Sequence, residues 1–253
     1  DTKGMQTSVK KLPGAYGANE PKQNAANLRT KGWELMLTWN DAFKLANKPF
    51  RYNLSVGLAD NTPEITKFDN PSKILSDYYV GQKLGDIWGY VVDGLFRTDE
   101  EAANYNVDQT AVNFVINTAQ VNPGLHAGDM KFVDLDGDHT ISSGSNTADD
   151  PGDRKIIGNS LPRYTYSIQG GFDWYGFDFS IYLQGVGHQD WYPGTNSVFF
   201  WGPYARPYSS FIPRDFLSQV WSPENPDAYF PRPIGYLALG NNRSLGVVND
   251  RYL

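Results

Sequence analysis

Alternation of apolar and polar side chains over residues 163–185 constrains the fold of this chain more than any other feature. Every second residue there is aromatic, aliphatic or glycine, and the period continues after a tight turn at Tyr175-Gly176. The row consists of Tyr164, Tyr166, Ile168, Gly170, Phe172, Trp174, Phe177, Phe179, Ile181 and Leu183. A period of two is typical of a β-strand with one apolar and one polar face. We therefore predict a hairpin with strands near 163–174 and 177–186.

Two kinds of protein are compatible with this hairpin. Each arm has about the 9–11 residues that a tilted strand needs to cross a bilayer. In a membrane barrel the lipid-facing row must be apolar, whereas the lumen-facing row can carry carboxylates and amides. The hairpin could therefore be part of an outer-membrane β-barrel or of a soluble β-sandwich, and its pattern alone leaves both open.

A second hairpin repeats the pattern nearer the N-terminus. Its predicted strands lie near 31–41 and 50–59, joined by a short connection over 41–49. The apolar rows are Trp33, Leu35, Leu37 and Trp39 in one arm, and Phe50, Tyr52, Leu54, Val56 and Leu58 in the other. Two such hairpins favour the barrel more than one does. In a barrel, Trp33, Trp39, Trp174 and Tyr175 are expected at the membrane interfaces, where aromatic girdles lie.

Composition excludes several classes of protein. Hydrophobic content is 40%, and no run approaches the roughly 18 apolar residues of a transmembrane helix, which excludes a helical membrane protein. The net charge is -6 without a run of basic residues, so we expect no nucleic-acid partner, which would need a basic footprint. There is no cysteine, so neither a disulfide nor a thiolate metal site can form. The aromatic content of 15% fits barrel girdles or a sugar-binding surface.

Regular alternation stops outside the two hairpins. Residues 60–162 and 187–248 are predicted to be loops, and loops of this length are uncommon in compact domains. Barrels keep their outer loops long and their periplasmic turns short, so we place both loops outside the cell and the connections 41–49 and 175–176 in the periplasm. Residues 1–30 are predicted to be another loop, which includes the end of a strand near 5–9.

Short structured segments are expected near these loops. Thr98 and Glu101 have the spacing of a capping box, in which each side chain accepts from the other's backbone N–H at the start of a helix. A second short helix is expected at Asp215–Trp221, and Asp250–Leu253 is expected to lead into another strand. The predicted fold class is all-β: a segment of a transmembrane antiparallel barrel with long extracellular loops and one or two short loop helices.

The sharpest chemical signal is a run of alternating aspartates. Asp134, Asp136 and Asp138, with the carbonyl of Thr140, have the spacing at which an EF-hand loop offers oxygen ligands to Ca²⁺. Oxygen ligands favour Ca²⁺ or Mg²⁺ over zinc. The run departs from an EF-hand because His139 replaces the usual glycine and position 12 is a serine, so the closing carboxylate would be Asp149, Asp150 or Asp153. The alternative is an Asp-rich turn with Asx hydrogen bonds and no ion.

An aromatic loop follows the second hairpin. Its members include Trp191, Tyr192, Phe199, Trp201, Tyr204 and Tyr208. These rings could stack on sugars or hold a peptide, contact a protein partner that covers the barrel, or pack only against their own loop.

Signatures of enzymes are absent from the sequence. It has no phosphate-binding Gly-x-x-x-x-Gly-Lys loop, no His-Glu-x-x-His pair and no Gly-x-Ser-x-Gly nucleophile turn. The three histidines are scattered, and His188 near Asp190 is the only pair that resembles a catalytic base. We therefore expect no enzymatic activity and no catalytic residues.

Four stretches together resemble the C-terminal part of the SusC/RagA family of TonB-linked outer-membrane receptors of Bacteroidetes. The first is LRTKGWELMLTW at 28–39, which is similar to a barrel strand of that family. The second is the Gly-Tyr-x-x-Asp-Gly-Leu-Phe segment ending at Phe96, followed by 98–101. The third is GDMKFVDLDGD at 128–138, with Ile157, Gly158, Asn159 and Pro162. The fourth is WSPENPDAYFPR at 221–232.

The resemblance implies a nutrient importer. Such a receptor is a plugged barrel of about 22 strands, covered outside by a SusD-like lipoprotein and driven through TonB, that imports glycans or peptides. The whole chain, 1–253, would be part of one barrel domain in the outer membrane. The plug domain, the TonB-binding segment and the final strands have no counterpart here, so we expect a fragment that pairs with the remaining parts of the barrel. The alternative is a secreted, Ca²⁺-stabilised β-sandwich that binds carbohydrate.

Overall fold

The computed structural model describes residues 1–8, 22–112, 124–194, 197–204, 212–233 and 246–253. Strands dominate, and the helices are short, which confirms the prediction of an all-β chain. In the described part of the chain, no helix is both long and apolar enough to cross a membrane. The chain forms two compact units. Unit 1 comprises Asp1–Pro71, Asp77–Gly85 and Asn159–Asp190, and unit 2 comprises Ser72–Ser76, Asp86–Gly158 and Trp191–Leu253.

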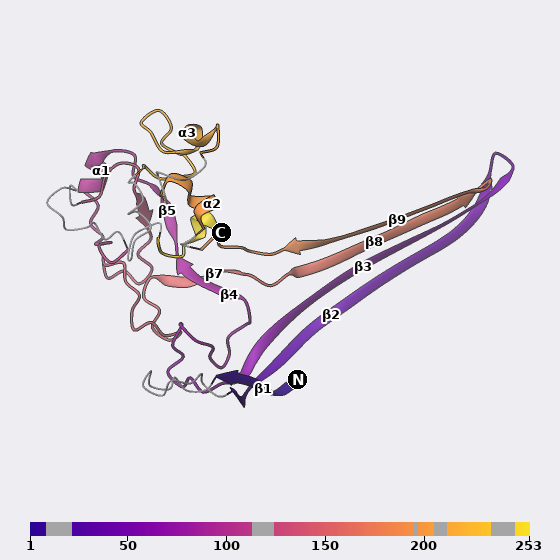
Figure 1. The fold of residues 1–253 in the computed structure, drawn as a ribbon, viewed down its shortest axis with the longest axis horizontal. Coiled ribbons are helices and arrows are strands. Elements are labelled where there is room, and N and C mark those ends of the chain that lie inside the picture. The colour runs from indigo at the N-terminus through magenta and orange to yellow at the C-terminus, as the bar shows by residue number, and fades with distance from the viewer. Residues whose placement is uncertain (9–21, 113–123, 195–196, 205–211, 234–245) are drawn as a thin grey trace. The chain divides into compact units, whose positions relative to one another are not determined.

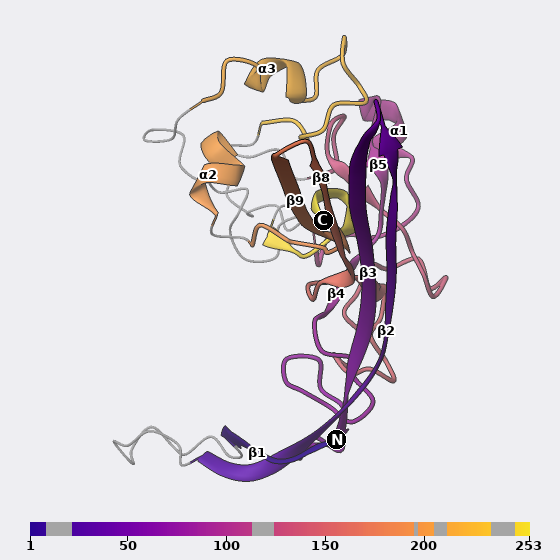
Figure 2. The same ribbon diagram turned by 90° about the vertical axis from the view of Figure 1, so that its right-hand side faces the viewer.

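Unit 1 is built on one antiparallel sheet of five strands in the order β1-β2-β3-β8-β9. The strands are β1 (Thr2–Ser8), β2 (Lys22–Leu45), β3 (Lys48–Lys67), β8 (Arg163–Trp174) and β9 (Phe177–His188). The hairpins β2–β3 and β8–β9 run side by side and turn at the same end of the sheet (Figure 1). Seen from the side, β2 and β3 curve along their length (Figure 2).

Several strands extend beyond the bounds that alternation predicts. β2 starts at Lys22 inside the predicted N-terminal loop, and β3 continues to Lys67 inside the predicted extracellular loop. Alternation missed these ends because polar side chains predominate there, with Leu28 and Ile65 among the few apolar ones. The connection predicted at 41–49 is in fact only Ala46-Asn47. β1 covers most of the strand end expected near 5–9, whose last residue lies outside the described part.

Both hairpin turns have backbone that suits a two-residue connection. Ala46 and Asn47 have φ angles of 48° and 63°, and Tyr175 and Gly176 have φ angles of 50° and 84°. Two successive residues with positive φ form the type I′ turn, whose twist matches that of the strands it joins. Asn and Gly adopt this conformation readily. The turns therefore fix the register of both hairpins.

Unit 2 contains two small sheets and several short helices. β4 (Asp86–Tyr90) pairs with β7 (Arg154–Asn159), and β5 (Val92–Leu95) pairs with β6 (Met130–Phe132). The α-helices are α1 (Asp99–Ala103), α2 (Val198–Trp201) and α3 (Phe216–Gln219). The described residues also form two 3-10 helices, η2 (Gly202–Tyr204) and η5 (Asp250–Tyr252). Residues 250–252 form η5, and the strand expected after 253 stays a prediction.

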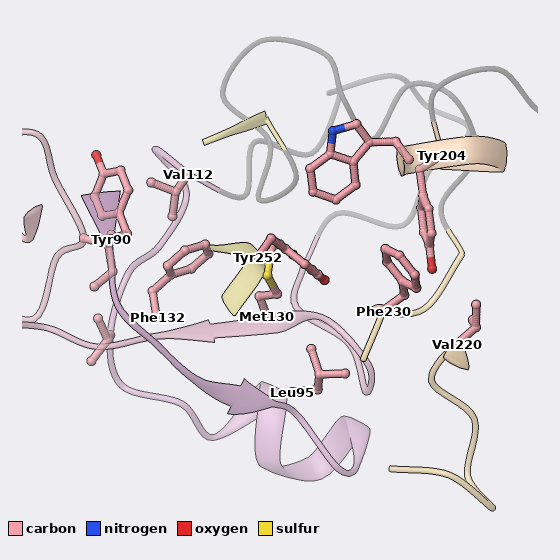
Figure 3. Close-up of a cluster of buried hydrophobic side chains, with 12 residues drawn as sticks. Tyr90, Leu95, Val112, Met130, Phe132, Tyr204, Val220, Phe230 and Tyr252 are labelled. Atoms are coloured by element: carbon pink, nitrogen blue, oxygen red, sulfur yellow. The ribbon is translucent and has the colours of Figure 1, made fainter. Parts of the chain in front are cut away.

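The core of unit 2 is rich in aromatic side chains that come from distant parts of the sequence. Phe132 and Met130 from β6 pack with Tyr252 from η5, and Tyr204 packs beside Phe230 (Figure 3). The described residues of 86–158 and 191–253 therefore pack around one hydrophobic core. Much of the two predicted extracellular loops belongs to this packed unit, whereas 60–71 and 77–85 belong to unit 1.

The capping box at α1 is confirmed in one half and corrected in the other. The Thr98 hydroxyl accepts from the backbone N–H of Glu101 at 3.1 Å, as the box requires. The Glu101 carboxylate, however, accepts from the N–H of Arg97 rather than that of Thr98. The helix predicted at Asp215–Trp221 exists as the shorter α3.

Candidate functional site

The sheet of unit 1 has one predominantly apolar face that extends across four strands. Leu37 pairs with Val56, Val56 with Ile168, and Ile168 with Leu183, so these residues form one row across β2, β3, β8 and β9. Similar rows lie above and below it. The other apolar side chains of this face are Leu35, Trp39, Phe43, Phe50, Tyr52, Leu54, Leu58, Tyr166, Phe172, Trp174, Phe177, Phe179 and Ile181.

This apolar face is open rather than covered. Leu35 is 48% exposed, Leu54 44% and Ile181 43%, and Ile168 is half-buried. A soluble β-sandwich buries such a face against a second sheet, and the described residues of unit 1 form no second sheet. An apolar surface of this extent marks contact with a membrane or a partner protein. Two charged residues near the turns depart from the pattern, because Asp41 and Lys48 both lie on the apolar face by strand alternation.

The opposite face is polar. Thr38 and Ser55 lie opposite each other with their hydroxyl oxygens 3.1 Å apart. Nearer the turns, Arg51 lies 3.9 Å from Asp173, and both side chains are largely exposed. Asp178 stands directly opposite Asp173 on the neighbouring strand. This arrangement suits a face in contact with water.

The acidic loop brings three of its predicted metal ligands together. Oxygen atoms of Asp134, Asp136 and Asp138 lie within 4.8 Å of one another. The loop also makes Asx hydrogen bonds: Asp134 accepts from the N–H of Gly137 and of His139, and Asp138 accepts from the N–H of Thr140. His139 has a φ of 64°, the left-handed conformation for which this position usually has glycine. The donor set, three carboxylates with a carbonyl at Thr140, fits Ca²⁺.

The charges of the loop repel one another. The N–H of Asp138 stabilises the ionised Asp136, but desolvation and the charges of Asp153, Asp138 and Asp134 outweigh it and raise the pKa of Asp136. At Asp134 desolvation opposes ionisation, but the N–H groups of Gly137 and His139 prevail and lower its pKa. A cation between these carboxylates would remove the repulsion.

Asp153 holds the loop closed. Its side chain is fully buried, and its two oxygens accept from the N–H of Leu135 and of Ser142, both at 2.7 Å. Leu135 lies within the aspartate run and Ser142 follows it, so one carboxylate links the start of the loop to the residue beyond its end. The place of Asp153 in the ligand set stays a prediction, because both its oxygens already accept backbone hydrogen bonds.

The aromatic loop divides into a buried and an exposed part. Trp201 and Tyr204 are almost fully buried and belong to the core of unit 2, where the Tyr204 hydroxyl donates to the carbonyl of Pro231. Tyr192 is half-buried and donates to the carbonyl of Val247. Trp191 is exposed, and Phe199 is 96% exposed. Only these last two rings are accessible to a ligand or partner, and Tyr208 lies outside the described residues.

His188 and Asp190 form a pair at the end of β9. The ring nitrogen Nε2 of His188 lies 3.1 Å from an oxygen of Asp190. The same oxygen accepts the backbone N–H of Asn159 at 2.7 Å. Asp190 therefore secures the end of β7 next to β9.

Sequence reasoning missed contacts that join residues far apart in the chain. Asp60 and Arg163 form two hydrogen bonds, Nε–Oδ1 at 2.6 Å and Nη2–Oδ2 at 2.5 Å, where β3 and β8 lie side by side. At the other end of the sheet, the Lys48 ammonium lies 5.0 Å from the centre of the Tyr175 ring. No local sequence motif predicts either contact, because each contact depends on which strands pair.

Comparison with known proteins gives three related receptors from Formosa agariphila. The chain is 27% identical to TonB-dependent receptor P39 over 193 residues, which is 67% of this chain and 18% of that protein. It is 23% identical to TonB-dependent receptor P3, over 68% of the chain and 16% of that protein. It is also 23% identical to TonB-dependent receptor P26, over 94% of the chain and 22% of that protein. No protein-family model matches the chain.

These receptors are homologues of the chain, and they support the TonB-linked family that the sequence motifs indicate. The chain spans about a fifth of the length of these curated relatives.

Proposed function

We propose that this homologue of TonB-dependent receptors supplies wall strands to an outer-membrane β-barrel that imports nutrients. The observation that carries the proposal is the two-faced sheet, in which the apolar row of Leu37, Val56, Ile168 and Leu183 crosses β2, β3, β8 and β9. Lipid would contact the apolar face, and the polar face would line the wet interior. β1 and β9 are the edges of the described sheet, and an unpaired edge in lipid leaves backbone groups unsatisfied. Further strands of a longer protein would therefore continue it.

We propose further that the receptor is of the SusC/RagA kind and works with a SusD-like lipoprotein. The order of four family-like stretches along the chain supports this assignment. Unit 2 would form part of the outer vestibule, where the exposed rings of Trp191 and Phe199 are suited to contact the lipoprotein or the ligand. The ligand would be a glycan or a peptide, and energy would come from TonB through parts of the protein beyond this chain.

Ca²⁺ at the acidic loop is a separate part of the proposal. Asp134, Asp136 and Asp138, with the carbonyl of Thr140, would hold the ion, and Asp153 would keep the loop in shape or close the ligand set. The ion would neutralise three adjacent carboxylates and stiffen this part of unit 2. It would have a structural role rather than a catalytic one.

The test of the proposed function uses the full-length receptor in its own host. Cell fractionation should place the receptor in the outer membrane, and detergent should be required to extract it. A SusD-like lipoprotein should co-purify with it, and deletion of the receptor gene should abolish growth on one class of glycan or peptide. A receptor that stays soluble without detergent would instead support the carbohydrate-binding β-sandwich.

A further inference from the structure

The turn end of the apolar face carries one basic side chain. Lys48 is the first residue of β3 and pairs with Leu45 at the end of β2. By strand alternation it lies on the same face as Phe50 and Tyr52, whereas Lys44 lies on the polar face. Lys48 is exposed, and no carboxylate of the described residues lies within 4.0 Å of its ammonium. The apolar face therefore ends in an unneutralised cation.

Aromatic side chains surround this end of the face. The Phe50 ring lies between those of Phe43 and Phe172, with centroid distances of 5.0 Å and 5.4 Å. The Phe179 ring continues the series at 5.3 Å from Phe172. Nearer the turns, the indole N–H of Trp174 donates to the carbonyl of Leu45 at 3.3 Å. Rings that combine an apolar body with a polar tip are typical of the membrane–water interface.

Tyr175 places the lysine at this boundary. Its ring is 65% exposed at the tip of the β8–β9 hairpin, and the Lys48 ammonium lies 5.0 Å from the ring centre. A cation over an aromatic face is held electrostatically without losing its access to anions. A lysine at the edge of an apolar surface also extends its ammonium toward the headgroup layer. Lys48 is therefore held where lipid phosphates would lie.

We propose that Lys48 and Tyr175 bind the phosphate of a phospholipid headgroup in the leaflet reached by the hairpin turns. The acyl chains of that lipid would lie along the aromatic series that includes Phe50 and Phe172. The inference rests on the proposed function, because it requires this face to be in contact with lipid. It adds the chemical class of a bound ligand and the residues that recognise its headgroup.

The experiment measures binding of phosphatidylglycerol to the full-length receptor in detergent, by native mass spectrometry. We expect Lys48→Gln to lower the affinity for the first bound lipid about five-fold, which is the effect of one lysine at an anionic membrane surface. Lys44→Gln is the matched control, because Lys44 flanks the same turn on the polar face, and it should leave the affinity unchanged. Lys48→Arg should keep most of the affinity.

Other outcomes would overturn the inference. An unchanged affinity in Lys48→Gln, or equal losses in both glutamine variants, would show that Lys48 does not recognise the lipid. Displacement of the lipid by a large excess of inorganic phosphate would indicate a free-anion site. Fractionation of the wild-type receptor distinguishes failure of the lipid site from failure of the proposed function, because it shows independently whether the receptor lies in the outer membrane. A receptor in the outer membrane that binds lipid independently of Lys48 refutes only the lipid site.

Discussion

Arg232 and Asp129 form an ion pair inside unit 2 although 103 residues separate them in the sequence. The guanidinium makes two hydrogen bonds to the carboxylate, Nε–Oδ1 at 2.6 Å and Nη2–Oδ2 at 3.1 Å. The Asp129 side chain is only 6% exposed. The same carboxylate accepts the backbone N–H of His126 at 2.9 Å. This pair therefore ties the segment after β9 to the segment between β3 and β8.

Arg232→Met should lower the stability of unit 2 strongly. Removal of one partner from a buried pair leaves an uncompensated charge, which costs about 3 kcal/mol. Hydrogen exchange of the full-length receptor should then be faster by about a hundred-fold in peptides covering 126–132, if local opening controls exchange. Arg97→Met is the control, because the Arg97–Asp227 pair is largely exposed and is worth at most about 1 kcal/mol. Equal effects of the two variants would contradict this role for Arg232.

Local patterns were sufficient to predict the four strands of the two hairpins and their faces, but not β4 to β7, which lie in a segment predicted to be a loop. The apolar alternation of 163–174 and 177–186 coincides with β8 and β9, because each residue's face depends only on its position along a strand. Where a strand loses that alternation, prediction fails. Asp41 interrupts the apolar row of β2, and Pro63 lies within the last part of β3. The sequence therefore predicted both strands too short.

The candidate sites were predictable only where their residues are close in sequence. The aspartates of the acidic loop alternate with single residues, and their oxygens lie within 4.8 Å of one another. For Trp201 and Tyr204, by contrast, the sequence leaves ligand contact, partner contact and packing within the loop open, and the structure places both rings beside Phe230 and Tyr252 in the core. Nothing in a single aromatic-rich stretch indicates which rings a distant segment will cover.

Asp153→Ala should open the acidic loop. The change leaves the N–H groups of Leu135 and Ser142 without their acceptor, at a cost of about 2 kcal/mol. Limited digestion of the full-length receptor with thermolysin should then cut within 134–153 faster than in the wild type. Asp149→Ala is the matched control, because Asp149 is exposed and pairs only with Lys73 among the described residues. Unchanged digestion of Asp153→Ala would show that the loop holds its shape by other contacts.

Ca²⁺ binding should depend on the aspartates of the loop and on pH. Titration calorimetry of the full-length receptor should give a binding isotherm that the double variant Asp134→Ala, Asp136→Ala abolishes. The pKa of Asp136 is raised above its ordinary value of 3.8, so protons should compete with Ca²⁺ at a higher pH than at an ordinary aspartate. Without Ca²⁺, a fall in pH has the opposite effect on stability. The raised pKa means that the folded state binds the Asp136 proton more tightly than the unfolded state, so protonation of Asp136 favours folding as pH falls. A wild-type receptor that releases no heat with Ca²⁺ would refute the metal site.

Leu183→Arg and Gln184→Arg test which face of β9 meets lipid. Leu183 belongs to the middle apolar row with Ile168, Val56 and Leu37, whereas Gln184 follows it on the polar face. An arginine at the bilayer midplane destabilises a barrel by about 2–4 kcal/mol, whereas a lumen position tolerates the charge. Leu183→Arg should therefore lower the folded fraction of full-length receptor in outer-membrane preparations, measured by its heat-dependent mobility in gels. Because the two positions are adjacent on one strand, a general defect in folding would affect both, and a loss in Gln184→Arg alone would mean that lipid contacts the opposite face.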